Sequence, residues 1–400
     1  MTQFSEQYAE FANFKIARLI SPAAVFVVYC FCVAFDFLAI APGVSLSRVM
    51  TYFLIIRYAW RIKNLKIITG PESVAYLLLL LVGLIATTFN GVTGSSVISF
   101  LTLALNIVVM ILVLGINYED RQIDFFNKAI IYSALVLCML LFLTPGQVGT
   151  EWVSDRIVVN IAGSQQDPNQ FCGYLIPLSC YATYSVFSKR RIRFLPVLVF
   201  VFYCILLTGS RGGLIANIAG CAVALAFAVK DSKHKGILIA AILLLSGMVF
   251  FNLDSVLETL PPSVADRFNS ATLGGGTASS RTRAWENVLH SFVSSGLPAQ
   301  LFGHGYGATT QVTYNGLVAH NAFIEVLYTL GILGFCLYMY VILRSLKSAF
   351  QNGRYWLLAS IIGNCVLLMT ISDYTSKTLW TTMVIALMPG QLVNKGDVIG

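Results

Sequence analysis

Long apolar stretches recur along the chain and are separated by short polar segments. They have about the length that crosses ~30 Å of hydrocarbon as a helix, so the pattern predicts membrane-spanning helices. Several are short or interrupted, which leaves open that one or two are re-entrant. We place twelve of them, at residues 22–42, 44–61, 73–90, 95–118, 126–144, 169–187, 194–209, 213–229, 236–252, 322–343, 356–372 and 378–392.

One polar segment, residues 253–318, is much longer than the others. It contains the sequence SSRTRAWENVLHSFV, in which Ser279 or Ser280 is a suitable N-cap for a helix. We expect a short helix over the outer face of the membrane. Its predicted apolar side carries Ala284, Val288, Leu289 and Phe292.

The pattern therefore predicts an all-α polytopic membrane protein with one large extracytoplasmic loop. Residues 1–252 would hold the first nine spans, residues 253–318 the loop with its short helices, and residues 319–400 the last three spans and a cytoplasmic tail. Composition supports this class, because 57% of the residues are hydrophobic and only 11% are charged. The N-terminus lacks a cleavage-site pattern, so we expect the first span to direct insertion.

Lysine and arginine indicate the orientation, since they accumulate on the cytoplasmic side of membranes. With the N-terminus inside, 19 of the 26 lysines and arginines fall on the inner side and 7 on the outer side. Both termini are therefore expected in the cytoplasm. The net charge of +8 is then an orientation signal with attraction to anionic lipid headgroups, and nucleic-acid binding is not expected.

The outer cations are almost all arginine. Guanidinium groups bind phosphate and carboxylate with two prongs, so this bias predicts an anionic ligand on the outer side. The alternative is that single arginines contact headgroups or pair with nearby acids. The set is Arg48, Arg156, Arg211, Arg267, Arg281, Arg283 and Lys377.

Three positions of the outer side are candidates for one site. Arg211 lies in the turn GSRGGLIA, where we expect the glycines to let the backbone approach a ligand. Arg281 and Arg283 lie on the predicted loop helix, two residues apart, so one of them is expected to be a bystander. His320 lies where the loop re-enters the membrane. Together they suit a lipid-linked diphosphate, with the imidazole binding phosphate or accepting a proton. The structural alternatives are a helix cap for Arg211 and an interfacial N-cap region for His320 and its neighbour.

Further polar residues flank these positions. Asp167-Pro168-Asn169 has the pattern of a helix start, with Asp as the cap and Pro in the first turn. Glu325 lies one turn inside the tenth span, where a charge is usually paired or functional, so an arginine is an expected partner.

The motif His320-Asn321, nine residues, then Gly331-Ile-Leu-Gly334 resembles the HNx9GxxG signature of the bacterial O-antigen ligase and Wzy-type polymerase superfamily. SRGG at 210–213, the helix with Arg281 and Arg283, and the DPNxF start at 167–171 are similar to its other features. The resemblance covers roughly residues 160–340.

This resemblance implies a glycosyltransferase of the polytopic C class. Such an enzyme acts on undecaprenyl-diphosphate-linked glycans outside the inner membrane, without a metal or cofactor, and inverts the anomeric centre. It implies catalytic roles for Arg211, His320 and one loop arginine, for which we favour Arg283. Substrate binding is then expected from Arg281, Asn321, Asp167, Asn169 and Glu325.

The product and the rival classes stay open. We favour a polymerase, whose acceptor is a second lipid-linked repeat unit and whose partner would be a chain-length regulator. A ligase would instead transfer the glycan to lipid A core. A secondary transporter shares the twelve spans, but no internal repeat is visible. A cell-wall glycosyltransferase of the shape, elongation and division type would need an outer-loop carboxylate, which Asp254, Glu258 or Asp266 could supply.

Overall fold

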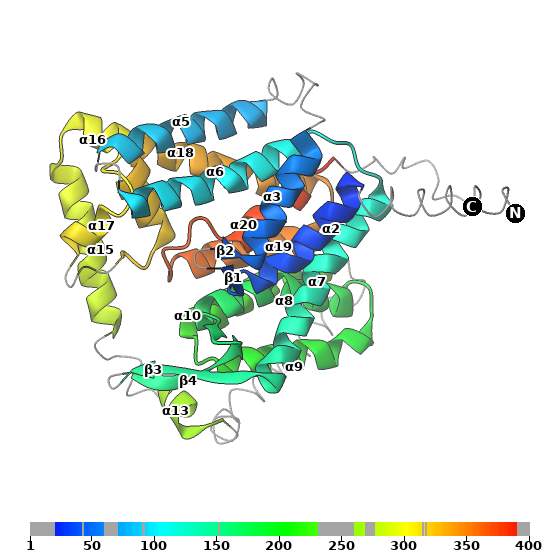
Figure 1. Cartoon of the computed structure of the whole chain (residues 1–400). Coiled ribbons are helices and arrows are strands. Elements are labelled where there is room, and N and C mark those ends of the chain that lie inside the picture. Colours follow the sequence, from blue (N-terminus) through cyan, green and yellow to red (C-terminus); the bar gives the residue numbers. More distant parts are fainter. Residues whose placement is uncertain are drawn as a thin grey trace, which may run out of the picture.

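Helices that share one hydrophobic core make up most of the molecule (Figure 1). The computed structural model describes residues 21–41, 44–59, 71–89, 93–150, 153–230, 260–268, 277–313, 316 and 318–389. The helices of the first half are α2 (Pro22–Cys32, continued by the turn η1, Val33–Phe35), α3 (Leu46–Ala59), α5 (Pro71–Phe89), α6 (Gly94–Leu114) and α7 (Asp120–Leu143). Those of the second half are α8 (Pro168–Phe187), η2 (Ile192–Phe194), α9 (Leu195–Leu207), α10 (Arg211–Lys230), α18 (Ala322–Gln351), α19 (Tyr355–Leu368) and α20 (Lys377–Leu387).

Four of the described helices have the length and composition to cross a membrane: α6, α7, α10 and α18. The predicted stretches coincide with helices except for 236–252, which lies outside the described residues. Many of these helices are shorter than predicted, because turns and strands occupy their ends. In the first stretch, for example, α2 ends at Cys32 and residues 39–41 form a strand. Twelve spans therefore stay a prediction.

Short β-strands correct the prediction of an all-α chain. β1 (Ala39–Ala41) pairs with β2 (Val44–Ser45), and β3 (Pro145–Thr150) pairs with β4 (Val153–Ile161), which also pairs with β5 (Ser164–Gln165). The β3–β4 hairpin lies at one corner of the molecule beside α13 (Figure 1). Alternating hydrophobicity is weak in these strands, so the sequence offered little signal for them.

Small residues let α10 pack closely between α8 and α19. A Cβ on Gly213 would clash with Cys172, and one on Gly220 would lie 2.8 Å from Cys180 Sγ. Gly363 of α19 likewise faces α8 and α10. Close approach through glycine is the usual device for helix packing in membranes. The glycines after Arg211 therefore serve helix packing, and the prediction that they admit a ligand is corrected.

The large loop contains the helices α13 (Pro262–Ala265), α15 (Thr277–Ser294), α16 (Leu297–Phe302) and α17 (Thr309–Val312), with the turn η3 (Asp266–Phe268). α15 begins before Ser279 and Ser280, so neither serine is its N-cap. On its apolar side Ala284, Val288 and Phe292 are buried as predicted, whereas Leu289 is exposed. These buried residues pack with α17 and α18, which fixes α15 against the start of α18.

Candidate functional site

The site is built around the start of α18. Asn321 is the N-cap of this helix, and its side chain accepts hydrogen bonds from the amides of Phe323 (3.0 Å) and Ile324 (3.2 Å). His320, directly before it, has a φ of +51°, a left-handed conformation that is uncommon outside glycine and is concentrated at functional sites. Asn321 therefore has a structural role that fixes the direction of the His320 side chain.

Glu325 holds the loop onto α18. Its carboxylate accepts hydrogen bonds from Thr309 Oγ1 (2.6 Å), the Ala319 amide (3.2 Å) and Ser372 Oγ (3.2 Å). These contacts correct the expectation of an arginine partner. Because Ala319 precedes His320, the Glu325 carboxylate helps to fix the position of the histidine.

The two glycines of the HNx9GxxG motif have separate structural roles. Gly331 interrupts α18 with φ +70° and ψ −174°, and a Cβ there would clash with the Leu301 carbonyl. The interruption frees the carbonyls of Tyr328 and Thr329, which accept hydrogen bonds from the amides of His304 (2.8 Å) and Gly305 (3.1 Å).

Gly334, the last residue of the motif, lies against Leu330 of its own helix and Val82 of α5. It therefore allows α18 to pack closely on α5. The spacing of the motif thus reflects one helix break and one helix crossing.

The DPN and SRGG motifs meet at the adjoining ends of α8 and α10. Asp167 caps α8 by accepting hydrogen bonds from the amides of Asn169 (2.8 Å) and Gln170 (2.9 Å). The Asn169 side chain accepts a hydrogen bond of 2.7 Å from Ser210 Oγ. The contact explains how Asn169 aligns the turn that carries Arg211.

Arg211 is linked to the large loop. Its Nε donates a hydrogen bond of 2.6 Å to the Arg267 carbonyl, and Arg267 Nε donates one of 2.9 Å to the Gly209 carbonyl. A Cβ on Gly209 would lie 2.7 Å from Arg267 Cδ, so only glycine fits this crossing, where φ is +61°. Two hydrogen bonds, one donated from each segment to the other, therefore join the α9–α10 turn to η3.

Arg281 and His320 lie in the same cluster. Burial lowers the pKa of the His320 imidazole, the nearby Arg281 lowers it further, and Asp167 opposes this shift. Burial and the charge of Arg211 lower the pKa of Arg281. On the same helix, Trp285 Nε1 donates a hydrogen bond of 2.7 Å to the Ala319 carbonyl, which holds α15 beside His320.

Arg283, in contrast, is exposed and does not contribute to these shifts. Arg281, rather than Arg283, is thus the loop arginine whose charge bears on His320 and whose own pKa the charge of Arg211 lowers. The sequence could not decide between the two arginines, because the decision depends on which side of α15 faces the rest of the protein.

Two arginines that the sequence did not select also join the cluster. Burial and the neighbouring Arg281 and Arg211 lower the pKa of Arg156 on β4, while Asp167 opposes the shift. Arg267 of η3 has a pKa lowered to about 10 by burial and by the charges of Arg156, Arg211 and Arg281. Both belonged to the set of outer arginines, and that bias was the signal that could have identified them.

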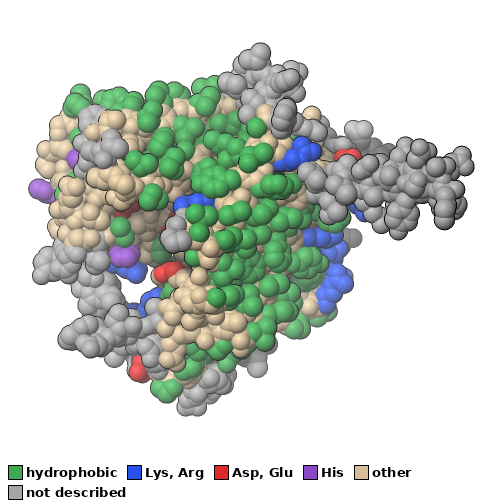
Figure 2. Space-filling model, in the orientation of Figure 1, with side chains coloured by type: hydrophobic (Ala, Val, Ile, Leu, Met, Phe, Trp, Pro, Cys, Tyr) green, Lys and Arg blue, Asp and Glu red, His purple; other side chains and the backbone are tan. Residues whose placement is uncertain are grey.

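The molecular surface is hollowed on one face of the protein. Figure 2 shows the hollow on the left of the face, and basic, acidic and histidine side chains gather in and around it. Hydrophobic side chains cover the broad area beside it, and further basic side chains lie at the right edge. A hollow with charged side chains thus lies next to a surface suited to lipid.

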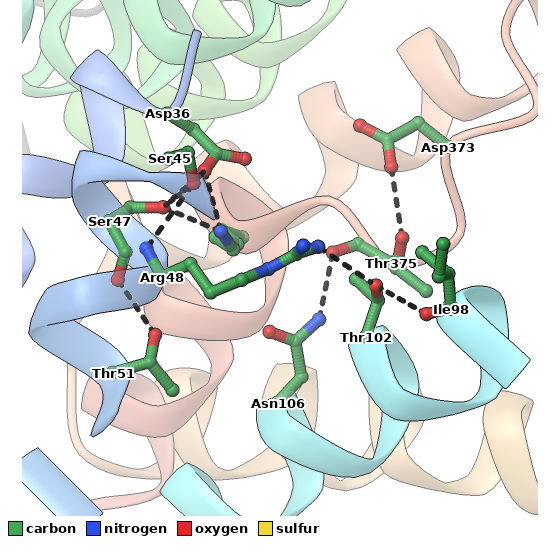
Figure 3. A network of polar contacts seen from close by, with 11 residues as sticks. Asp36, Ser45, Ser47, Arg48, Thr51, Ile98, Thr102, Asn106, Asp373 and Thr375 are labelled. Atoms are coloured by element: carbon green, nitrogen blue, oxygen red, sulfur yellow. Dashed lines mark hydrogen bonds and ion pairs between the residues drawn. The ribbon is translucent and has the colours of Figure 1, made fainter. Parts of the chain in front are cut away.

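A second polar network lies among α3, α6 and α20 (Figure 3). Lys377 Nζ contacts Asp36 Oδ1 (2.6 Å) and Ser47 Oγ (2.5 Å), and Ser45 Oγ donates to the same carboxylate oxygen (2.5 Å). Arg48 points toward α6, where it donates to Thr102 Oγ1 (3.4 Å). Two of the outer cations thus belong to a separate centre.

Next to this network lies the loop between α19 and α20. Asn106 Nδ2 donates to the Thr375 carbonyl (2.8 Å), and Thr375 Oγ1 donates to Asp373 (3.3 Å). Burial, with the Asp36 charge second, raises the pKa of Asp373 to about 6. Within the described residues, no group of three or more His, Cys, Asp or Glu side chains could hold a metal ion.

The fold and the site define a membrane-embedded helical protein with a cluster of arginines near the start of a kinked helix. Residues 196–339 match the family model of O-antigen ligase. This match confirms the resemblance to the O-antigen ligase and polymerase superfamily and points to a glycan-transferring enzyme. It extends from α9 to α18, and so includes Arg211, Arg281 and His320. No curated protein sequence matches the chain.

Proposed function

We propose that the protein is an inverting, metal-independent membrane glycosyltransferase that polymerises undecaprenyl-diphosphate-linked oligosaccharide repeat units. One observation carries this proposal. Arg211, Arg281 and His320 come from distant parts of the chain, and contacts between their segments support one cluster: Trp285, on the helix of Arg281, donates to the Ala319 carbonyl beside His320, and the charge of Arg211 bears on Arg281. Such a cluster suits a substrate with a diphosphate leaving group.

The roles of the residues follow from their charges. Arg211 and Arg281 would stabilise the charge that builds on the departing diphosphate, in a partly dehydrated site where each contact is worth more than in water. His320 is neutral at pH 7 because its pKa is lowered, so it can accept the proton of the acceptor hydroxyl. Attack opposite the leaving group inverts the anomeric centre.

The supporting residues position this machinery. We assign the loop-arginine role to Arg281, since Arg283 is exposed and turned away from the cluster. Asn321 fixes the His320 backbone. Asp167 and Asn169 hold the adjoining ends of α8 and α10, and we propose that they contact the substrate from there.

The membrane context is part of the proposal. We place the protein in the bacterial inner membrane as a polytopic C-class enzyme, with both termini in the cytoplasm and the site on the outer face. The basic side chains beyond the hydrophobic band, opposite the hollow in Figure 2, support this orientation. Partners are the lipid-linked donor, the glycan acceptor and a chain-length regulator.

Ligase activity is the second candidate function, because the matching family model is described as O-antigen ligase. The two activities use the same donor and differ in the acceptor. A knockout separates them: single repeats on the core sugar indicate a lost polymerase, whereas long chains that remain on the lipid carrier indicate a lost ligase.

The direct test is a transfer assay with purified protein and lipid-diphosphate repeat units in the presence of EDTA. Transfer should persist with EDTA, and His320→Ala and Arg211→Ala should each abolish it while the protein still folds. Arg211→Lys should not restore activity, since lysine cannot supply the two-pronged contact. Normal transfer by His320→Ala or Arg211→Ala would reject the assigned site.

A further inference from the structure

Arg156 approaches the α9–α10 turn from the β3–β4 hairpin. Its Cγ lies 3.9 Å from the position that a Cβ on Gly209 would take. The Nε of Arg156 is buried and has no hydrogen-bond partner in the protein. A buried donor without a partner is unfavourable, so its presence here suggests an acceptor supplied by a ligand.

Arg267 approaches the same turn from the large loop. Its Nε donates a hydrogen bond of 2.9 Å to the Gly209 carbonyl. Among the described residues, no further acceptor holds the two terminal nitrogens of this guanidinium group. The hydrogen bond of the Arg267 Nε therefore orients this guanidinium group and leaves its two terminal nitrogens able to bind a ligand. Such a geometry orients a guanidinium fork toward an anion.

The four arginines repel one another in the free protein. Arg156, Arg267 and Arg281 all have lowered pKa values, chiefly because of burial and then because of their arginine neighbours. The carboxylate that opposes this, Asp167, already accepts two backbone hydrogen bonds of α8.

This arrangement lowers the stability of the unliganded protein and becomes favourable once an anion is present. Four guanidinium groups can contact the phosphate oxygens of one ligand. The binding partner should therefore be a multiply charged anion.

We propose that Arg156 and Arg267 complete the diphosphate site of Arg211 and Arg281, so that four guanidinium groups from separate segments contact the leaving lipid diphosphate. The inference rests on the proposed glycosyl transfer. In that reaction the bond between the anomeric carbon and the phosphate oxygen breaks, and its electron pair stays on the oxygen. The acceptor oxygen forms the new bond to carbon and releases its proton to His320.

The lipid diphosphate therefore leaves with one more negative charge than it carried in the donor. A second pair of guanidinium groups stabilises this developing charge more than it stabilises the donor. Interactions that strengthen in the transition state raise the rate rather than the ground-state affinity. Arg156 and Arg267 should accordingly affect kcat more than KM.

The experiment compares Arg156→Gln, Arg156→Lys and Arg267→Gln with Arg283→Gln, an exposed arginine of α15 that serves as the matched control. Arg156 is the main test, since Arg267 also fastens the loop and its loss could disturb folding. Two quantities are measured on folded protein in detergent: steady-state transfer, and the affinities for a short polyprenyl diphosphate and the corresponding monophosphate.

We expect Arg156→Gln and Arg267→Gln to lower kcat by about 10²-fold, with a smaller change in KM. Both should lose most of the preference for diphosphate over monophosphate, Arg156→Lys should recover it only partly, and Arg283→Gln should resemble the wild type.

The inference would be overturned if Arg156→Gln had the same kinetics and the same preference for diphosphate as Arg283→Gln. In that case transfer by the wild type would still support the proposed function. A wild type that prefers the diphosphate through Arg156 but transfers no glycan would keep the four-arginine anion site and reject glycosyl transfer.

Discussion

The Arg211 Nε donates to the Arg267 carbonyl at 2.6 Å, and the Arg267 Nε donates back to the Gly209 carbonyl at 2.9 Å. This exchange joins the α9–α10 turn to a segment more than fifty residues later. A substitution at Gly209 should therefore affect both segments.

Gly209→Ala should displace the Arg267 side chain, because the new Cβ would lie 2.7 Å from Arg267 Cδ. We expect transfer to fall at least about tenfold, the size of one charge-assisted contact. Gly163→Ala is the control: its φ of +83° gives a similar backbone strain, but nothing lies within 4 Å of the added Cβ. Equal transfer rates in the two variants would contradict the proposed link.

Arg281→Gln should reduce transfer by about 10²-fold, whereas Arg283→Gln should stay within about twofold of the wild type. The reason is that Arg281 is half-buried beside Arg211 and His320, and Arg283 is exposed. The measurement is the initial rate with a lipid-diphosphate donor. A larger loss in Arg283→Gln would reverse the assignment of the loop arginine.

Gly331→Ala should destabilise the protein strongly. The added Cβ clashes with the Leu301 carbonyl, and moving that segment would leave the Tyr328 and Thr329 carbonyls without their donors. Each lost partner costs about 1–3 kcal/mol. Gly353→Ala has a φ of +64° with nothing within 4 Å, so it should cost only about 1–2 kcal/mol. Thermal unfolding in detergent distinguishes them, and equal midpoints would contradict the role of the break.

The acid limit of activity should depend on Arg281. Because burial and Arg281 lower the pKa of His320 from 6.5, the imidazole stays neutral near pH 7 and protonates only at lower pH. Arg281→Gln removes a positive neighbour and should raise that pKa, whereas Arg283→Gln should leave it unchanged. NMR titration of the His320 ring protons measures the shift. An unaltered titration in Arg281→Gln would show that the two side chains do not interact.

Asp373→Asn should stabilise the protein more at pH 8 than at pH 4. The folded-state pKa of Asp373 is raised from 3.8 to about 6, so the unfolded chain ionises first, and the folded protein loses stability as the pH rises from 3.8 to about 6. An amide avoids that cost. Asp124→Asn is the control, since Asp124 lies in an exposed pair with Lys128. Unfolding midpoints at the two pH values test this, and a stabilisation that does not depend on pH would argue against the shift.

Local motifs selected the candidate residues that lie at helix ends, although the sequence favoured Arg283 over Arg281 as the catalytic loop arginine. Arg211, Arg281 and His320 stood out because each is a polar residue at a turn, a loop helix or a helix start on the outer side. The pattern Asp-Pro-Asn predicted that Asp167 caps a helix, and in the structure its carboxylate accepts a hydrogen bond from the Asn169 amide at the start of α8.

Long-range contacts decided what the sequence missed. Arg156 reaches the cluster only through the pairing of β3 with β4, and Arg267 only through the docking of η3 on the α9–α10 turn. The choice between Arg281 and Arg283 depends on which side of α15 faces α18. Glu325 had been expected to pair with an arginine, but tertiary packing gave it Thr309 and Ser372 as partners.

The break at Gly331 constrains how the large loop can be exchanged between related proteins. At this break the carbonyls of Tyr328 and Thr329 accept hydrogen bonds from the amides of His304 and Gly305. The loop therefore supplies backbone hydrogen bonds that the helix itself lacks. A chimera that received a foreign loop without the matching half of α18 would leave the buried carbonyls of Tyr328 and Thr329 without their donors. The loop and the start of α18 should therefore be exchanged together. Chimeras between related proteins that join the two sequences after α18 should fold better than chimeras that join them within it.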